Sequence, residues 1–404
     1  MVTSSIRQSI TTSNMSQSIS SNNRAQPEAS SSQNQPELYQ QELYQKIATS
    51  LGCHQGLDVQ VIQRLWGGYG ELVRLVFSQE NSAELKSVIV KHVALPDKAE
   101  HPKGWNTKLS HQRKVHSYQV ETEWYQSFTQ EWDERCPVPV GLQCELQENE
   151  WLIVMQDLAD IGFPLTSQFD VLAVSDDLAT KDTQSELASA YTLEEQKQRD
   201  ACLKWLANFH AKHINVDQEQ SASLWQVGTY WHLDTRPDEL NALADLPLKN
   251  QAQHIDRLLK ECPYQTLVHG DAKLANFCFD SESQNAAAVD FQYVGNGCAM
   301  KDVALFMSSA VRPQDCAELE SHMLETYFRY LEEALAYYQS QLSFDEIEAA
   351  WRPMFYVAWA DFQRFVKGWS PEHWKINPYT EQLTQTVIEQ LESPELVASN
   401  LQTK

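Results

Sequence analysis

The chain has 404 residues, of which 42% are hydrophobic and 10% aromatic, so it can bury a sizeable core in two lobes or a few domains. A formal net charge of −24 excludes broad electrostatic attachment to nucleic acid or an anionic membrane, and it favours a cationic small molecule over an anionic one. Eight scattered cysteines without zinc spacing, no apolar run of membrane-spanning length and no signal peptide predict a cytoplasmic protein.

Residues 1–36 are rich in Ser, Asn and Gln, which predicts a disordered tail. "ELYQQELYQKIATSLG" then carries Leu and Tyr at helical spacing. Alternating apolar runs around a glycine-rich turn, "VQVIQRLWGGYGELVRLVFS", predict a hairpin, and "LKSVIVKHVAL" predicts a third strand. "HQRKVHSYQVETEWYQSFTQEW" has helical periodicity, and "VGLQCELQENEWLIVMQDLAD" predicts two more strands. We expect residues 37–157 to form a first, strand-rich lobe.

The rest of the chain, residues 158–404, is predicted to be mostly helical. Residues from about 166 to 196 are polar and acidic, which indicates a flexible insertion. "LEEQKQRDACLKWLANFHAKHI" then carries an apolar stripe at helical spacing, and further helical patterns continue to the C-terminus. A strand-rich half followed by a helix-rich half indicates two lobes with a cleft between them.

A polar cluster in "LVHGDAKLANFCF" and "AAAVDFQYVG" lies between apolar runs, where polar side chains must be satisfied or used. Two short strands joined by "DSESQN" form a predicted hairpin, which brings Asn276 and Asp290 side by side. A carbonyl oxygen beside a carboxylate suits Mg²⁺ that holds phosphate oxygens. Asp271 lies on the preceding loop and can accept a hydroxyl proton, and Lys273 can reach a phosphate.

The longer pattern "HGDAKLANF…AAAVDFQ" resembles the catalytic and metal-binding segments of the kinase-like phosphotransferases, which include aminoglycoside phosphotransferases, choline kinases and fructosamine kinases. Its D-F-Q, in place of the D-F-G of protein kinases, is most similar to the ecdysteroid-kinase-like group. The resemblance covers about residues 50–380. It implies an α+β, protein-kinase-like fold, with a five-stranded antiparallel N-lobe around one main helix and a mostly helical C-lobe.

Carried over residue by residue, Asp271 matches the catalytic aspartate, and Asn276 and Asp290 match the two Mg²⁺ ligands. His269 matches a buried histidine that shapes the catalytic loop. Lys273 stands where Ser/Thr protein kinases place a lysine near the γ-phosphate, although many small-molecule kinases have another residue there. The resemblance thus implies ATP and Mg²⁺ as cofactors.

The resemblance also assigns a nucleotide-binding half. Gly67, Gly68 and Gly70 match the loop over the phosphates, although a glycine-rich hairpin turn explains them equally well. Lys91 matches the strand lysine that grips the α- and β-phosphates. Glu121 resembles its helix partner, because residues 118, 121 and 125 share one helical face, and Glu123 is the alternative. The hinge is expected at Met155 to Leu158, with the backbone of Gln156 and Leu158 bonding a purine.

Two further residues are expected to be structural. His210, in "LANFHA", is predicted to be packed in the core. Asp302 matches an aspartate that opens the next helix, and we expect it to cap that helix.

The acceptor is expected among the C-terminal aromatic residues, which either pack the core or line a pocket: Trp359, Trp369, Trp374 and Tyr379. Asp361 and Arg364, on one helical face, can pair with each other or address a substrate. Only twelve residues separate Asp290 from Asp302, which disfavours a protein substrate.

We therefore expect ATP- and Mg²⁺-dependent phosphate transfer to a hydroxyl of a small molecule, without nucleic-acid or membrane partners. The alternatives are an inactive nucleotide-binding regulator, an acidic interaction protein, and a choline- or amino-sugar-type kinase with a cationic substrate.

Overall fold

The computed structural model describes residues 34–53, 56–65, 69–78, 85–95, 108–147, 149–172, 191–217 and 219–393. Most of the predicted tail, residues 1–33, and residues 173–190 of the predicted insertion lie outside the described residues. The chain divides into two compact units, residues 1–51 and 52–404, and each is described by itself. In the first unit, helix α1 spans Asn34–Ser50 and begins three residues before the sequence-predicted start of order.

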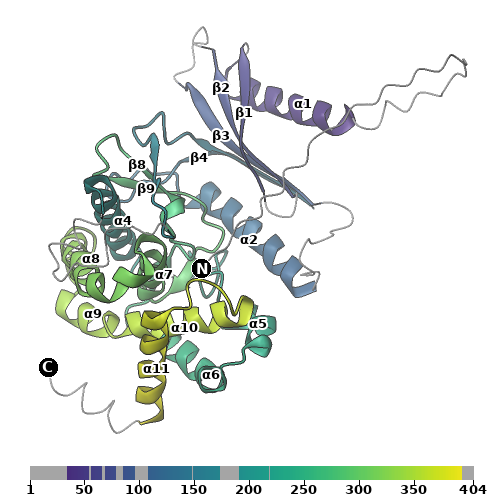
Figure 1. Ribbon diagram of the computed structural model, residues 1–404. Coiled ribbons are helices and arrows are strands. Elements are labelled where there is room, and N and C mark those ends of the chain that lie inside the picture. Colours follow the sequence, from purple (N-terminus) through teal and green to yellow (C-terminus); the bar gives the residue numbers. More distant parts are fainter. Residues whose placement is uncertain are drawn as a thin grey trace, which may run out of the picture. The chain divides into compact units, whose positions relative to one another are not determined.

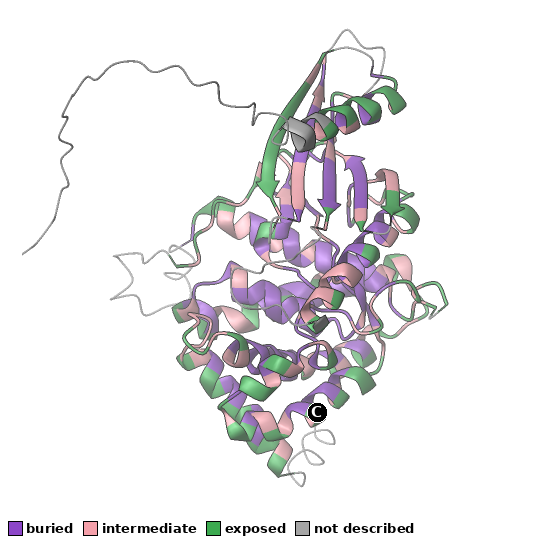
Figure 2. Ribbon diagram, turned by 90° about the vertical axis from the view of Figure 1, so that its right-hand side faces the viewer, coloured by how far each residue is buried: buried purple, intermediate pink, exposed green. Residues whose placement is uncertain are grey.

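The second unit starts with a five-stranded antiparallel sheet in the order β1-β2-β3-β5-β4, which confirms the predicted sheet (Figure 1). Its strands are β1 (Leu57–Arg64), β2 (Gly70–Phe77), β3 (Ser87–Ala94), β4 (Gly141–Gln147) and β5 (Glu150–Gln156). The central strand β3 is buried on both faces, as its continuous apolar sequence requires, whereas the polar edge strand β1 is exposed (Figure 2).

Helix α2 (Lys108–Ser127) packs against β4 and β5 of this sheet. Its buried residues Tyr118, Glu121 and Tyr125 share one face, as predicted from their spacing. Trp124, also buried, stacks on Phe291 from the second half of the chain at 4.5 Å between ring centroids. The helix is therefore anchored both to the sheet and to the segment that carries the candidate metal ligand.

After β5 the chain forms short strands that hold the candidate catalytic loop. β6 (Leu165–Thr166), β8 (Phe277–Phe279) and β9 (Ala286–Ala288) make one small sheet, and β7 (Thr266–Val268) pairs with β10 (Gly295–Gly297). Phe277 faces Ala288 in the β8–β9 pair, so the predicted hairpin is present. The loop between β7 and β8, including a 3₁₀ turn at Leu274–Asn276, is thereby held at both ends.

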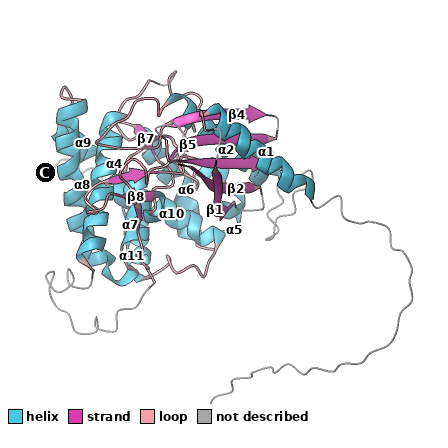
Figure 3. Ribbon diagram, turned by 90° about the horizontal axis from the view of Figure 1, so that it is seen from above, coloured by secondary structure: helices cyan, strands magenta, loops and turns pink. Residues whose placement is uncertain are grey.

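The remaining elements are mainly helical and surround these strands (Figure 3). They are α4 (Leu193–Lys212), α5 (Pro237–Ala242), α6 (Leu246–Glu261), α7 (Met300–Ala310), α8 (Cys316–Tyr338), α9 (Phe344–Trp351), α10 (Met354–Trp369) and α11 (Pro378–Glu392), with 3₁₀ turns at Leu233–Thr235 and Pro313–Asp315. Helix α4 packs against α8, and α10 packs against α5, α6, α7 and α11. None of the helices in the described ranges combines the length and apolarity needed to cross a membrane.

Candidate active site

Lys91, on the central strand β3, lies between two carboxylates from other elements. Its Nζ is 2.8 and 2.7 Å from the carboxylate oxygens of Glu121 on α2, and 3.1 Å from Oδ1 of Asp290 beyond β9. Lys91 and Glu121 are almost fully buried, which strengthens their attraction. The structure thus brings three predicted site residues together. The alternative, Glu123, accepts a hydrogen bond from Ser127 on its own helix.

Asp290 is held by the hairpin and by the residues that follow it. The N–H of Val289 donates to the carbonyl of Asn276 at 3.0 Å, which fixes the two predicted metal ligands to neighbouring strands. Asp290 itself has φ of 69°, in a left-handed region that aspartate tolerates better than most residues. Gln292 donates from Nε2 to Oδ1 of Asp290 at 2.8 Å and accepts from Nζ of Lys114 at 2.7 Å. The third residue of the D-F-Q segment therefore orients the first.

Asp302 holds the backbone of the loop before Asp271. Its Oδ2 accepts the N–H of His269 at 2.5 Å and its Oδ1 accepts the N–H of Gly270 at 3.0 Å. The prediction that Asp302 caps α7 is wrong: the N-cap is Ala299, and the carboxylate points to amides of another segment. His210 is buried as predicted, and its ring lies between Oδ2 of Asp302, at 3.2 Å, and the hydroxyl of Tyr327, at 2.8 Å.

His269 also supports this loop, as predicted. Its Nδ1 accepts the N–H of Asp271 at 3.3 Å, so Nε2 carries the proton and donates to the carbonyl of Val289 at 3.0 Å. Gly270 has φ of +79°, and a Cβ there would lie 2.0 Å from the carbonyl oxygen of Tyr293. The glycine of the H-G-D segment is therefore required by a close backbone approach.

Asp271 is buried at the end of this loop and shares one carboxylate oxygen with two donors. Its Oδ2 accepts from Nζ of Lys273 at 2.9 Å and from Nδ2 of Asn276 at 3.3 Å. Oδ1 accepts no hydrogen bond from the described residues. The carboxylate is thus fixed through one oxygen while the other stays available.

The two aspartates differ in acidity because their surroundings differ. Burial raises the pKa of Asp271 above its ordinary value, Lys273 opposes this, and the charge of Asp290 adds to it. Burial would also raise the pKa of Asp290, but three neighbouring lysines hold it well below its ordinary value: Lys91, Lys273 and Lys114. Asp271 is therefore the better proton acceptor, and Asp290 stays ionised.

The atoms left uncommitted at Asn276 and Asp290 suit a hard cation. Nδ2 of Asn276 donates to the backbone carbonyl of Asp271 at 2.8 Å and to its carboxylate. Oδ1 of the same amide accepts no hydrogen bond from the described residues. Oδ2 of Asp290 is likewise uncommitted. Among the described residues no three His, Cys, Asp or Glu side chains cluster as a metal site. The pair therefore fits an ion such as Mg²⁺ that takes its other ligands from phosphate or water.

The predicted hinge has some backbone groups engaged and others open. The N–H of Gln156 donates to the carbonyl of Val140 at 3.0 Å, and the carbonyl of Leu158 accepts from Phe163 at 2.8 Å. The N–H of Leu158 donates to none of the described residues, and the binding of a purine at this hinge stays a prediction. Between the two hinge residues, Asp157 is buried and accepts hydrogen bonds from Arg74 on β2 and from the Ser87 hydroxyl at 2.7 Å, which ties the hinge to the sheet.

Of the predicted phosphate-loop glycines, Gly67 and Gly68 lie outside the described residues. Gly70 begins β2, and a Cβ at this position would lie 2.0 Å from the carbonyl oxygen of His92 on β3. Close packing of two strands is enough to explain Gly70, so its role over the phosphates stays a prediction.

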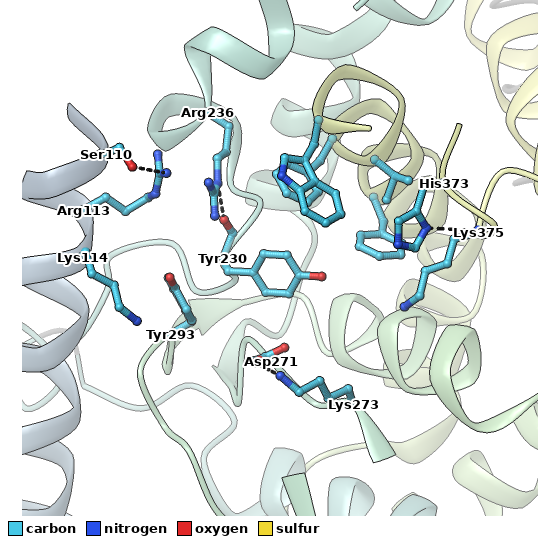
Figure 4. Close-up of a pocket in the computed structure, with 14 residues that line it drawn as sticks. Ser110, Arg113, Lys114, Tyr230, Arg236, Asp271, Lys273, Tyr293, His373 and Lys375 are labelled. Atoms are coloured by element: carbon cyan, nitrogen blue, oxygen red, sulfur yellow. Dashed lines mark hydrogen bonds and ion pairs between the residues drawn. The ribbon is translucent and has the colours of Figure 1, made fainter. Parts of the chain in front are cut away.

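A cavity of about 630 Å³ opens beside Asp271 (Figure 4). Its lining includes Asp271 and Lys273, but not Lys91, Asn276 or Asp290. Lys114 on its wall donates to Gln292, which in turn donates to Asp290, so the cavity adjoins the candidate metal ligand. The remaining lining residues come from α2, the segment before α5, Tyr293, α10 and the segment after α10: Ser110, Arg113, Lys114, Tyr230, Arg236, Tyr293, Phe362, Phe365, Val366, Trp369, His373 and Lys375.

The aromatic candidates separate into pocket and core. Trp369 lines the cavity, whereas Trp359 is buried in the core. Trp374 lines a smaller neighbouring cavity, and Tyr379 donates from its hydroxyl to Glu320 at 2.7 Å. Of the two alternatives that the sequence left open, lining this cavity therefore applies to Trp369 alone among these four residues.

Asp361 and Arg364 pair with each other. Nε of Arg364 donates to Oδ1 of Asp361 at 2.9 Å, and Nη2 donates to the carbonyl of Trp231 at 2.8 Å. Both side chains are buried and neither lines the cavity, so the pair joins α10 to the core.

Apart from Lys273, sequence reasoning missed the cations of the cavity. Lys114 could have been found, because extending the stripe of Tyr118 and Glu121 back by one turn reaches it. Arg236 and Lys375 carry no such signal, since they lie in irregular segments far apart in the sequence.

The model of the ecdysteroid kinase-like family matches residues 70–340 of this chain, and no curated protein matches it. Similar solved structures include an ethanolamine kinase from Plasmodium vivax, 12% identical over 88% of this chain and 89% of that one, with a TM-score of 0.46. The choline kinase LicA from Streptococcus pneumoniae is 13% identical over 88% and 99%, with a TM-score of 0.38. The aminoglycoside phosphotransferase APH(3'')-Id from Streptomyces rimosus ATCC10970 is 12% identical over 81% and 98%, with a TM-score of 0.40.

Proposed function

Because the chain belongs to the ecdysteroid kinase-like family, we propose that it transfers the γ-phosphate of ATP, with Mg²⁺, to a hydroxyl group of a small molecule. The observation that carries the proposal is the contact of Lys91 with both Glu121 and Asp290. It joins the sheet, the main helix and the candidate metal ligand at one point, beside a cavity that reaches Asp271. Phosphoryl transfer needs this kind of positioning and charge neutralisation more than covalent chemistry by the protein.

In this proposal Lys91 holds the α- and β-phosphates, and Glu121 keeps the lysine in place. Oδ1 of Asn276 and Oδ2 of Asp290 would hold Mg²⁺, which when bound neutralises charge on the phosphates. The carbonyl of Gln156 and the N–H of Leu158 would bond the purine, and the loop that contains Gly67, Gly68 and Gly70 would cover the phosphates. Each of these roles is a proposal from the family pattern and from the groups that remain free.

The chemical step is centred on Asp271. Its free Oδ1 accepts the proton of the acceptor hydroxyl as the hydroxyl oxygen bonds to the γ-phosphorus. The bond between that phosphorus and the β,γ-bridging oxygen breaks, ADP leaves, and the proton passes from Asp271 to solvent. Lys273, fixed by its contact with Oδ2, offers its cation to the group in transfer.

An inactive nucleotide-binding regulator is the alternative function. It is disfavoured because Lys91, Asp271, Asn276 and Asp290 are all present and are held by specific partners. We place the reaction in the cytoplasm, a proposal supported by eight cysteines that are all free thiols.

Thermal unfolding with ATP and Mg²⁺ tests the first half of the proposal. We expect a non-hydrolysable ATP analogue to raise the unfolding temperature, and EDTA to remove that rise. If the analogue gives no Mg²⁺-dependent stabilisation, the nucleotide site is wrong. ATP consumption in the presence of hydroxylated metabolites then tests transfer. The regulator alternative predicts ATP binding without consumption for every acceptor.

A further inference from the structure

The cavity beside Asp271 is basic, although the chain as a whole carries a net charge of −24. Its charged lining residues are five cations and one carboxylate: Arg113, Lys114, Arg236, Lys273, Lys375 and Asp271. Lys273 is paired with Asp271 itself. The net charge of the residues that line the pocket is therefore positive, opposite to the negative net charge of the whole chain.

Three of these cations have no carboxylate within 4.0 Å in the described parts of the chain. Arg113 donates to the carbonyl of Thr235 at 2.7 Å, Lys114 to Gln292, and Lys375 to the hydroxyl of Ser308 at 2.8 Å. All three partners are neutral. All three side chains are partly exposed and line the cavity, so an anion bound there would give them the close counter-charge that no described carboxylate supplies.

Arg113 and Arg236 lie at one end of the cavity and Lys375 lies at the other end (Figure 4). The ring of Tyr230 lies between Arg236 and Lys375. Burial and the charge of Arg236 lower the pKa of Arg113. Arg236 has one carboxylate partner, Glu239, at 3.1 Å, so the two guanidinium groups keep an excess positive charge. Nε of Arg113 and Nη2 of Arg236 donate to none of the described residues. Two adjacent guanidinium groups with free N–H donors match the geometry of a carboxylate, sulfonate or phosphonate group.

The opposite end of the cavity is also cationic. Burial lowers the pKa of Lys375 to about 8, with Asp271 acting against this shift and Lys273 adding to it. An ammonium group beside Asp271 would therefore meet both lysines. The acceptor hydroxyl can approach Asp271 without that repulsion only if the part of the molecule near it is uncharged or anionic.

Between the charged ends the wall is apolar. Phe362, Phe365, Val366 and Trp369 lie along one side of helix α10, and the ring of Phe365 supports the guanidinium of Arg236 at 4.9 Å. A volume of about 630 Å³ is sufficient for a drug-sized molecule.

We propose that the acceptor is a hydroxylated molecule with a largely apolar body and an anionic group, which binds Arg113 and Arg236 while the hydroxyl faces Asp271. The proposal rests on the proposed function, because it names the acceptor of that same site. It runs against the choline- and amino-sugar-type alternative, whose acceptors are cations.

Matched acceptors of different charge test the proposal on the full-length chain with ATP and Mg²⁺. One set is 4-(hydroxymethyl)benzoate, its methyl ester and 4-(hydroxymethyl)benzylamine. A longer, flexible set is 12-hydroxydodecanoate, its methyl ester and 12-amino-1-dodecanol. We expect kcat/KM for the carboxylate to exceed that for the ester by about tenfold, with the amine lowest. Adding 4-(hydroxymethyl)phenylphosphonate distinguishes a phosphonate or phosphate group from a carboxylate as the preferred anion.

Arg113→Gln is the decisive variant. We expect kcat/KM for the carboxylate to fall about tenfold or more, while values for the ester and KM for ATP stay within about twofold. A purely structural role would lower the carboxylate and ester values equally. Arg329→Gln is the matched control, because Arg329 is exposed on α8 and pairs only with Glu333 among the described residues. Should Arg113→Gln unfold, Arg236→Lys serves as the second variant, because it keeps a cation beside Glu239 but loses the free Nη2 donor, and the same loss is expected for the carboxylate.

The outcomes separate the two proposals. If the ester or the amine is phosphorylated as well as the carboxylate in both sets, the acceptor proposal is wrong and the transferase proposal stands. If Arg113→Gln raises KM for ATP instead, the cations serve the nucleotide and the acceptor proposal is again wrong. Where no probe is phosphorylated, the rise in unfolding temperature caused by each probe is compared instead. Equal rises with carboxylates and esters overturn the acceptor proposal. Loss of Mg²⁺-dependent ATP binding would instead remove the proposed function itself.

Discussion

Lys91 contacts the candidate metal ligand Asp290, whereas Lys375 lines the cavity beside Asp271, and the surroundings of the two lysines differ. Nζ of Lys91 lies within 3.1 Å of two carboxylates. Nζ of Lys375 instead donates to the neutral hydroxyl of Ser308 and lies over the rings of Phe362 and Trp374. Arg113 likewise donates to a neutral group. The protein pairs Lys91 with its own carboxylates, and it leaves Arg113 and Lys375 in the pocket without one within 4.0 Å among the described residues.

The difference indicates that the side chains around Lys91 are held in position before a substrate binds, whereas Arg113 and Lys375 in the pocket still lack a carboxylate partner among the described residues. Fixed ion pairs hold Lys91 and Asp290 in place, so the proposed transfer would need little reorganisation there. Unpaired cations remain at a free-energy cost until an anion arrives, and such strained or unsatisfied features gather where ligands bind. The substitutions below test this difference between the two regions, in order of decreasing expected effect.

Asp271→Asn removes the one group that the two regions share. We expect kcat to fall about 10³-fold, within the range for loss of a general base, while Mg²⁺-dependent stabilisation by ATP persists. The measurement is ATP consumption with the best acceptor found, beside thermal unfolding with an ATP analogue. An unchanged kcat would show that the proton leaves by another route.

Glu121→Gln makes the nucleotide side resemble the pocket side, since Lys91 then keeps only Asp290 as a charged partner. We expect kcat/KM for ATP to fall about 10- to 100-fold, because Lys91 loses its bidentate carboxylate. Glu123→Gln on the same helix is the control, and we expect it to change kcat/KM by less than about twofold. Equal effects of the two variants would contradict the assignment.

The same variant has a signature in the pH dependence of stability. Burial, with the charge of Asp290 adding to it and Lys91 opposing it, raises the pKa of Glu121 from 4.5 to about 7. Between these values the folded chain binds more protons than the unfolded chain, so this group makes the free energy of unfolding fall as pH rises from about 4.5 to about 7. We expect Glu121→Gln to flatten that decline in urea titrations at several pH values. A decline of unchanged slope would assign it to other groups.

Asp302→Asn tests the loop at His269 and Gly270, whose N–H groups donate to Asp302. This loop positions Asp271. The Asp302 side chain would lose its charge while facing two backbone N–H donors and His210, so we expect the free energy of unfolding to fall by about 2 kcal/mol. Asp170→Asn, in an exposed loop where the side chain accepts one backbone N–H at 2.9 Å, is expected to cost less than about 0.5 kcal/mol. Urea unfolding measures both.

Much of the nucleotide side could be predicted because its residues are close together in the sequence or follow a regular period. Asp271, Asn276 and Asp290 lie on one loop and one hairpin, and Glu121 follows from a helical stripe. Asp302 was assigned to the wrong task, since its partners are the amides of His269 and Gly270, which local sequence cannot bring near.

The pocket could not be predicted in the same way. Its lining comes from α2, α10 and irregular segments on both sides of the catalytic loop, so no short motif encodes it. The aromatic density of α10 was visible, but burial separates Trp359 from Trp369 only once the helix has been packed. The net charge of the chain favours a cationic ligand, whereas most of the charged residues that line the pocket are cations, so the charge of the whole chain does not predict the charge of one pocket.

Lys375→Met sharpens the contrast by removing one unpaired cation. Burial first, with Lys273 adding, lowers the pKa of Lys375 to about 8, so below pH 8 its charge makes the folded state less stable. We expect the variant to raise the free energy of unfolding at pH 7 by about 1 kcal/mol, a partial gain because the contact with Ser308 is lost. That gain should shrink as pH rises from about 8 towards 10.5, where the Lys375 side chain becomes neutral in both the folded and the unfolded state.

Lys260→Met is the matched control. The Lys260 cation pairs with Asp256 at 2.8 Å, so its loss should lower the free energy of unfolding slightly. Opposite signs for the two lysines, measured by urea unfolding, would separate a cation kept for a ligand from one kept for the fold, and equal losses would contradict that distinction.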